Sequence, residues 1–306
     1  MKILTLYSDK GGVAKTTTTP NLAAALKYRL PKANIGLMDL CSDHGHLSKL
    51  YATNNEQQFH GIWNIIDVLL DPRQKNNNKK IASAVNSAVT QIRVLPNTID
   101  ADGCVSFLNV GVALSKNLRG ASVFASMDTA KQFGHTLLTA IAQTLNLEYL
   151  IVDLPGMVDD AMVRAVLPHC YAAVIPIDMR NYLNLAEGGV LIEKLRGRGI
   201  YPSGFLRTFI DEGKRISAAQ EVAESLLQEL SYANKVPILD GGIPNKTTLV
   251  QAITPISTDI RSIPTVGLYS MAAQKGINSS QKGVIYRTLA AVDNTLTAML
   301  DILANN

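Results

Sequence analysis

Short apolar runs alternate with longer segments of helical periodicity along this chain. The apolar runs occupy residues 3–7, 35–40, 92–95, 149–153, 172–177, 205–210 and 236–243. Runs of this length, separated by helical segments, are typical of buried strands in a parallel sheet. The pattern therefore predicts an α/β fold, with a mostly parallel twisted sheet covered by helices on both faces.

Two further segments extend this prediction. Residues 71–81 include the polar and basic run from Pro72 to Lys80, which has no apolar period and predicts a mobile surface loop. Contact of this loop with DNA or a partner is the alternative. Residues 282–303 carry apolar side chains near helical spacing and predict a C-terminal helix. Its basic residues are offset by acidic ones, so we expect it to pack on the domain rather than on an anionic membrane.

The composition indicates one soluble globular domain spanning 1–306. Of the 306 residues, 47% are hydrophobic and 18% charged, and no stretch reaches the ~20 apolar residues of a membrane span. We expect a cytoplasmic protein. The three cysteines, Cys41, Cys104 and Cys170, are widely separated, which argues against a disulfide framework or a zinc site. The net charge of +4 is too small to indicate nucleic-acid binding by itself.

A glycine-containing loop joins the first apolar run to a helical segment at residues 18–30. A strand that turns sharply into a helix leaves backbone N–H groups pointing one way, which suits an anion. Gly11 and Gly12 let the backbone approach phosphate oxygens, Lys15 can reach the β- and γ-phosphates, and Thr16 can coordinate Mg²⁺. The loop therefore predicts binding of a nucleoside triphosphate.

The loop fails the ordinary G-x-x-x-x-G-K-[ST] pattern at both glycines, where Asp9 and Ala14 stand, and it carries an extra lysine, Lys10. It resembles instead the deviant Walker A loop, K-G-G-x-G-K-T-T, of the ParA/MinD family of P-loop ATPases. The resemblance implies a P-loop NTPase fold and a homodimer bridged by ATP, in which Lys10 reaches the partner's nucleotide. The loop residues that would bind ATP are Lys10, Gly11, Gly12, Val13, Ala14, Lys15, Thr16 and Thr17.

The segment after the second apolar run, Asp39-Leu40-Cys41-Ser42-Asp43, resembles the family's D-x-D-P-Q. There the first Asp helps to order the magnesium shell and the second positions the attacking water. Asp39 matches the first, but Cys41 replaces the second, and a thiol is a poor substitute for a carboxylate near neutral pH. We therefore expect slow hydrolysis, with Asp43 as the nearest alternative catalytic residue and His44 and His46 as weaker ones. Ala14, at a family glycine, is expected to crowd or tighten the loop.

A third motif, Asp153-Leu154-Pro155-Gly156, resembles the Walker B strand end and its switch. An aspartate that ends a buried strand is costly unless it serves a cation, so Asp153 is expected to hold a magnesium-bound water. Gly156 would let the backbone move when the γ-phosphate leaves. Resemblance to two later family segments implies adenine contacts at Thr208, Pro244 and Asn245. The resemblance covers nearly the whole chain.

What the resemblance implies is ATP-dependent DNA partition, of a plasmid or a similar element. ATP and Mg²⁺ would close the dimer, which would bind DNA without sequence preference and associate with the nucleoid. A centromere-binding adaptor protein would trigger release. The candidate DNA contacts, each of which an ordinary solvated surface also explains, are Lys194, Arg196, Arg198, Lys214, Arg215, Arg261, Lys275 and Arg287.

Two alternatives remain open. A nucleotide-gated scaffold that hardly hydrolyses ATP, recruiting proteins in conjugation or at a cell pole, is favoured by Cys41. A metabolic P-loop ligase is also compatible with the motifs. The nitrogenase iron-protein type is disfavoured, because Cys170 lies too far beyond Asp153 to match that family's second cysteine.

Overall fold

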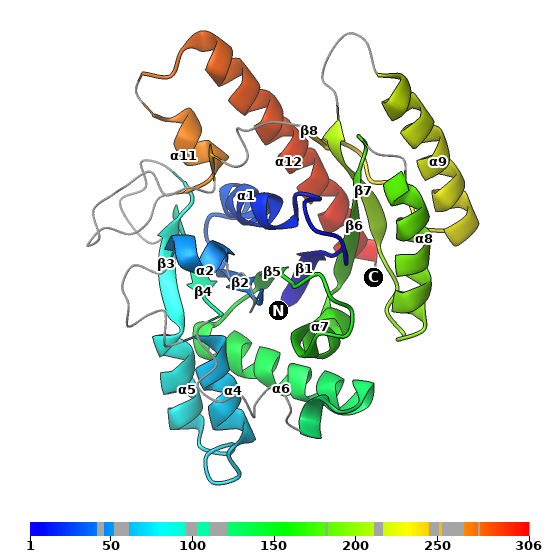
Figure 1. Ribbon diagram of the computed structural model, residues 1–306. Helices are drawn as coiled ribbons and strands as arrows, with labels where there is room; N and C mark the ends of the chain where they lie inside the picture. The colour runs from blue at the N-terminus through cyan, green and yellow to red at the C-terminus, as the bar shows by residue number, and fades with distance from the viewer. Residues whose placement is uncertain are drawn as a thin grey trace.

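The computed structural model describes residues 1–41, 46–51, 61–95, 103–110, 122–180, 183–210, 217–244, 251–252, 266–274 and 276–305. These residues form one sheet with strand order β3-β4-β2-β5-β1-β6-β7-β8 (Figure 1). The strands are β1 (Lys2–Leu6), β2 (Ile35–Asp39), β3 (Val89–Arg93), β4 (Cys104–Leu108), β5 (Tyr149–Asp153), β6 (Ala172–Asp178), β7 (Gly204–Ile210) and β8 (Ile243–Pro244). Among them, the pairing of β3 with β4 is antiparallel and the rest is parallel. The predicted α/β fold is confirmed.

Helices cover both faces of the sheet, as Figure 1 shows. One face carries α1 (Lys15–Arg29), α11 (Leu268–Ala272) and α12 (Ser279–Asn305). The other carries α4 (Ile62–Leu70), α5 (Asn78–Ser87), α6 (Met127–Leu145), α7 (Ala161–Val166), α8 (Leu183–Arg196) and α9 (Ala218–Asn234). Successive side chains of a strand point to opposite faces, so the core has two halves: Leu4 of β1 packs on the α1 side of the sheet and Ile3 on the α6 side. A short helix, α2 (His46–Tyr51), and the 3-10 turns Ser122–Phe124 and Leu167–His169 complete the described elements.

Two strand predictions need correction. The run at 236–243 is not a strand over its length: Ile238 makes an isolated bridge to Phe205, and regular pairing begins at Ile243. Conversely, β4 was not predicted. Its sequence, Cys-Val-Ser-Phe-Leu, has a polar Ser106 at the centre, which interrupts the apolar run. Ser106 faces Gln91 of β3 and accepts a hydrogen bond from it at 3.1 Å, so the edge position of this strand pair explains the polar residue.

Two helix boundaries also differ from the predictions. The loop expected to run through Lys80 ends earlier, because α5 begins at Asn78 and the Asn77 side chain caps it by accepting from the Lys80 amide. The first helix starts at Lys15 rather than near residue 18, and Pro20 lies inside it.

The C-terminal segment forms α12, which buries Ile285, Val292, Leu296, Met299 and Leu303 against the α1 side of the sheet. Arg29 of α1 ties it down through an ion pair with Asp293 at 2.7 Å. The apolar side of α12 is therefore occupied by the body of the domain. None of the helices in the described ranges has the length and apolar character that crossing a membrane requires.

Candidate functional site

The carboxyl ends of the central parallel strands meet at one edge of the sheet. Asp39 at the end of β2 and Asp153 at the end of β5 are register partners, and Leu6 at the end of β1 is the next partner of Asp153. The loop that connects β1 to α1 runs over this edge. Ligands bind at this edge in open α/β sheets, so the fold brings the loop and both aspartates to one place.

The loop has an unusual backbone. Gly12 lies at φ +77°, and Ala14, which precedes the first residue of α1, lies at φ +67° in the left-handed region. No described side chain caps α1, so its first-turn N–H groups face the loop without a side-chain acceptor. Val13 is buried beneath, whereas a Cβ at Gly11 would meet nothing within 4 Å. Such a concave loop at a helix N-terminus suits a phosphate group.

The two loop lysines have different surroundings. Lys15 is half-buried and its ammonium donates to the Lys10 carbonyl at 2.6 Å, while desolvation lowers the pKa of Lys15 against the opposing attraction of Asp153. Lys10 is partly exposed and forms an ion pair with Glu187 of α8. Lys194 of α8 reaches the loop as well, at 3.4 Å from Asp9. Lys15 therefore lies inside the site, and Lys10 lies on its outer surface.

Asp39 is fully buried, and three donors of the described residues Cys41 and Ser48 hold it. Its Oδ1 accepts from the Cys41 amide at 2.9 Å, and its Oδ2 accepts from the amide and the hydroxyl of Ser48, each at 2.8 Å. The Ser48 hydroxyl also accepts from the Val110 amide at 3.0 Å. Sequence reasoning missed Ser48, because nothing in the run His-Leu-Ser-Lys-Leu-Tyr marks a serine nine residues beyond Asp39 as its partner.

Asp153 is equally buried, yet neither of its carboxylate oxygens has a hydrogen-bond partner among the described residues. Burial, followed by repulsion from Asp39, raises the pKa of Asp153 to about 7, while the nearby Thr16, Lys15 and Cys41 side chains oppose the shift. A buried carboxylate without a partner is costly unless a cation compensates it. The position therefore fits a divalent cation or a water that such a cation binds.

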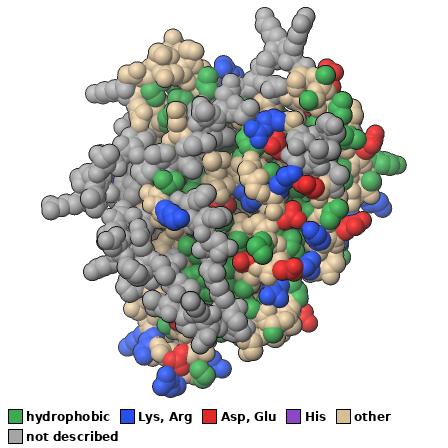
Figure 2. Space-filling view, in the orientation of Figure 1, with side chains coloured by type: hydrophobic (Ala, Val, Ile, Leu, Met, Phe, Trp, Pro, Cys, Tyr) green, Lys and Arg blue, Asp and Glu red, His purple; other side chains and the backbone are tan. Residues whose placement is uncertain are grey.

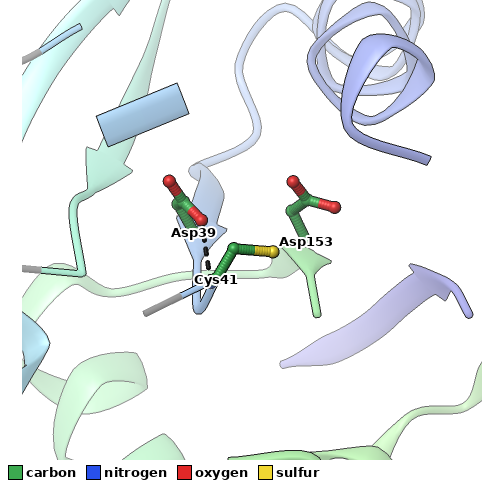
Figure 3. Close-up of side chains that lie close together, drawn as sticks. All are labelled: Asp39, Cys41 and Asp153. Carbon is green, nitrogen blue, oxygen red and sulfur yellow. Dashed lines mark hydrogen bonds between the residues drawn. The ribbon is translucent and has the colours of Figure 1, made fainter. Parts of the chain in front are cut away.

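Cys41 completes a cluster with the two aspartates. Its side chain extends from the end of β2 toward Asp153 (Figure 3), and the ligand atoms of Asp39, Cys41 and Asp153 lie within 4.8 Å of one another. Burial, together with the neighbouring carboxylates, strongly raises the pKa of the Cys41 thiol. In the metal-free protein the thiol is therefore neutral near neutral pH and is a poor acceptor for a proton from water.

The remaining predicted residues fall into two groups. Thr16 lies beside Asp153, and Thr17 donates to the Ala14 carbonyl at 3.1 Å. Thr208 and Pro244 sit on adjacent strands, but the Thr208 hydroxyl is buried and donates to Ile177 at 3.0 Å, so its side chain is not open to a base in this conformation. Asp43, His44 and Asn245 lie outside the described residues, as does the side chain of His46.

One residue near the predicted base site was not anticipated. Phe209, at a register shift between β7 and β8, lies at φ +59°, which is rare for a large side chain. The Arg180 guanidinium covers its ring at 3.8 Å from the centroid and pairs with Asp178 at 2.7 Å. Local sequence gives no sign of this arrangement, because the strand and the arginine come from separate segments.

Basic side chains on the α8 side of the site are interleaved with acidic ones, and Figure 2 shows Lys and Arg beside Asp and Glu rather than one basic patch. Of the predicted DNA contacts, Lys194 pairs with Asp9 and Arg198 with Asp159, while Arg196 donates to the Asn234 backbone. Arg287 also has an interaction. The other candidates, Lys214, Arg215, Arg261 and Lys275, lie outside the described residues.

No family model matches the sequence, and none of the curated proteins does. Solved structures match over nearly the whole chain. McdA from Cyanothece is 17% identical with a TM-score of 0.63, and the match covers 97% of this chain and 99% of that one. A cobyrinic acid a,c-diamide synthase from Mycobacterium smegmatis, bound to an ATP analogue and magnesium, is 16% identical with a TM-score of 0.60, covering 99% and 96%. A putative plasmid partition protein from Borrelia burgdorferi B31, bound to AMPPNP, is 15% identical with a TM-score of 0.57, covering 99% and 98%.

At this identity the likeness shows the fold. The resemblance to ParA/MinD-type P-loop ATPases that the loop motif predicted is confirmed at that level. Because a synthase and a partition protein share the fold, architecture by itself does not choose between a biosynthetic enzyme and a partition switch.

Proposed function

We propose that this chain is a ParA-like ATPase, a switch that dimerises on ATP and Mg²⁺ and acts in DNA partition. One observation carries the proposal: a loop with two lysines and left-handed backbone at Gly12 and Ala14 leads into α1, whose first residues Lys15 and Thr16 lie beside the unpartnered carboxylate of Asp153. The McdA and partition-protein structures bound to ATP or AMPPNP support it, because they share the fold.

Each site residue has a role in this proposal. The loop amides and Lys15 hold the β- and γ-phosphates, and Thr16 with Asp153 holds Mg²⁺ directly or through water. Asp39, fixed by Ser48, orders the magnesium shell. Magnesium supplies charge neutralisation of the phosphates when bound. Lys10, on the outer surface, would exchange its ion pair with Glu187 for the partner's nucleotide, because exposed ion pairs are weak.

The DNA cycle follows from this dimer. The ATP-bound dimer binds DNA through phosphate contacts and associates with the nucleoid, and a centromere-binding adaptor releases it. The basic side chains with acidic partners in the described part would have to exchange those partners for phosphates, so the segments carrying Lys214, Arg215 and Arg261 become the first candidates for DNA contact. Binding of this kind falls steeply with salt.

The decisive experiment measures molecular mass and DNA retardation together, with and without ATP–Mg²⁺. We expect a dimer that retards duplex DNA with ATP present and a monomer that does not without it. Lys15→Ala should lose nucleotide binding, whereas Lys10→Ala should keep nucleotide binding and lose dimerisation. Equal DNA binding in both states, or no binding of adenine nucleotide, would remove the proposal.

A scaffold that binds ATP and scarcely hydrolyses it is the second candidate, and the neutral, buried Cys41 favours it. Cys41→Asp tests it by restoring a carboxylate in the predicted water-positioning place. If the natural chain is slow for want of this group, phosphate release should rise by roughly 10²-fold, the lower end of general acid–base effects. Cys41→Ser is the matched control and should give no rise. Appreciable turnover in the unmodified chain would count against the scaffold.

A further inference from the structure

The cluster at the ends of β2 and β5 combines two kinds of ligand. Asp39 and Asp153 offer carboxylate oxygens, and Cys41 offers a sulfur, with all three ligand atoms within 4.8 Å of one another. Asp153 is the independent sign of a ligand: its two oxygens are buried and unpartnered among the described residues, and the Cys41 sulfur, which points toward Asp153 (Figure 3), lies within 4.8 Å of one of them.

Magnesium makes no use of the sulfur. Mg²⁺ is bound by oxygen and keeps several waters, whereas zinc and cadmium prefer thiolate. Zn–S and Zn–O bonds of about 2.3 and 2.0–2.2 Å place sulfur and oxygen ligands roughly 3.5 Å apart in a tetrahedral centre. The ligand atoms that lie farthest apart would therefore need to approach one another by at most about 1.3 Å, which small side-chain rotations supply.

We propose that Asp39, Cys41 and Asp153 form a binding site for a thiophilic divalent cation of the zinc class. The cation takes one sulfur and two oxygens and keeps an open position for water or a phosphate oxygen. On binding, the S–H bond of Cys41 breaks, a sulfur–metal bond forms and the proton passes to solvent. Two carboxylates and one thiolate carry three negative charges, which the cation and the neighbouring Lys15 ammonium neutralise.

The three ligands differ in how firmly hydrogen bonds fix them before a cation binds. Asp39 is fixed by the Ser48 amide and hydroxyl and by the Cys41 amide, which gives the cluster a rigid oxygen ligand. The Cys41 amide bond to Asp39 also fixes the backbone that carries the sulfur. Asp153 brings the carboxylate that gains most from a cation, because its buried oxygens accept no hydrogen bond from the described residues and the nearby Lys15 ammonium compensates its charge only in part.

This site overlaps the proposed magnesium site, so a thiophilic cation would compete with Mg²⁺ for Asp39 and Asp153 and would interfere with the proposed ATP–Mg²⁺-dependent switch. The metal inference itself rests on the three side chains and not on the proposed function. A chain that binds no ATP at all would still bind the cation.

The test uses the full-length, nucleotide-free protein and Cd²⁺ and Co²⁺ as probes. We expect one equivalent of Cd²⁺ to give thiolate-to-metal charge-transfer absorption in the ultraviolet, and Co²⁺ to give the corresponding near-ultraviolet band. Cys41→Ser should abolish both bands and weaken Cd²⁺ binding by more than about 100-fold, beyond the 10–100-fold typical of outer-shell changes. Asp153→Asn should weaken it at least about 10-fold.

Cys104→Ala is the matched control, because Cys104 is buried in β4 and its electrostatic neighbours are Arg93 and Lys27 rather than carboxylates. It should keep both bands, and Cys170→Ala serves the same purpose should Cys104→Ala not fold. Bands that persist in Cys41→Ser, or their absence from the unmodified protein, overturn the inference. Binding of ATP–Mg²⁺ is measured on the same sample, so that loss of the metal site and loss of the proposed function are separate results.

Discussion

Asp39 and Asp153 are neighbours in the same sheet register, equally buried, and surrounded in opposite ways. Asp39 receives three hydrogen bonds from Cys41 and Ser48. Asp153, one strand away, receives none among the described residues. The described residues therefore satisfy the first carboxylate and not the second, which is the arrangement that the proposed cation site requires.

The difference separates two kinds of functional residue. A carboxylate with internal donors stabilises the fold and is already in position before any ligand arrives. A carboxylate without donors destabilises the fold until a cation compensates it, and that lost stability is recovered as binding free energy. The two loop lysines differ in their partners, since the half-buried Lys15 donates to a backbone carbonyl of the loop and Lys10 pairs with Glu187 of α8.

The largest predicted effect is that of Asp153→Asn. The pKa of Asp153 is about 7 in the fold against an ordinary 3.8, so between about pH 4 and 7 the folded protein holds a proton that the unfolded chain has released. The free energy of unfolding of the metal-free protein therefore falls as pH rises through this window, by at most about 4 kcal/mol, and stays lower above it. Asp153→Asn should remove this slope and raise stability at pH 8, as denaturant unfolding at several pH values would show.

Asp39→Asn is the matched variant and should act in the opposite direction. An amide has one acceptor oxygen where the carboxylate has two, and its NH₂ group would face an N–H or O–H donor. We expect a loss of about 1.5–3 kcal/mol, the range for hydrogen bonds to a charged group. If both asparagine variants changed stability with the same sign, the contrast between the two carboxylates would be mistaken.

Ser48→Ala tests the internal partner directly. It removes one donor from Asp39 and leaves the buried Val110 amide without its acceptor, so we expect a loss of about 1–3 kcal/mol in the free energy of unfolding. Ser87→Ala is the control, because the Ser87 hydroxyl is exposed and bonds only to carbonyls of its own helix. Its effect should lie within about 0.5 kcal/mol. Equal losses in both variants would show that Ser48 does not support Asp39.

The contrast also marks what the sequence was able to predict. Asp39, Asp153 and the loop lysines stand at strand ends or in a compact motif, so local pattern predicted them and the fold brought them together. Ser48 and the Arg180–Phe209 contact depend on how separate segments meet, which no local pattern records. β4 escaped because the polar Ser106, which faces Gln91 of the edge strand β3, interrupts its apolar run. The roles of the loop residues and of Thr208 and Pro244 in ATP binding stay predictions.

Ala14 offers a smaller effect in the loop that faces Asp153. Its left-handed backbone places the methyl group against the following carbonyl, which costs an L-residue about 1 kcal/mol and costs glycine nothing. We expect Ala14→Gly to stabilise the nucleotide-free protein by up to about 1 kcal/mol, measured by thermal or denaturant unfolding. Ala290→Gly, at an exposed position within right-handed α12, should instead lose about 1 kcal/mol. A loss in both variants would mean that the loop residue carries no strain.

Glu187→Gln should have the smallest effect on stability, below about 1 kcal/mol, because both partners of its ion pair with Lys10 are partly exposed. Its consequence for assembly is more informative than its effect on folding. Glu187 of the same chain competes for Lys10 with a nucleotide bound to a second copy. Removing the Glu187 charge should therefore tighten ATP-dependent dimerisation by at most about fivefold. Light scattering over a range of protein concentrations would measure this change. Asp159→Asn, which breaks the exposed Arg198 pair, is the control and should leave dimerisation unchanged. Weaker dimerisation in Glu187→Gln would instead indicate that Glu187 orients Lys10 toward the partner. Lys10 would then resemble Asp39, because groups of its own chain would hold it in position before a ligand arrives.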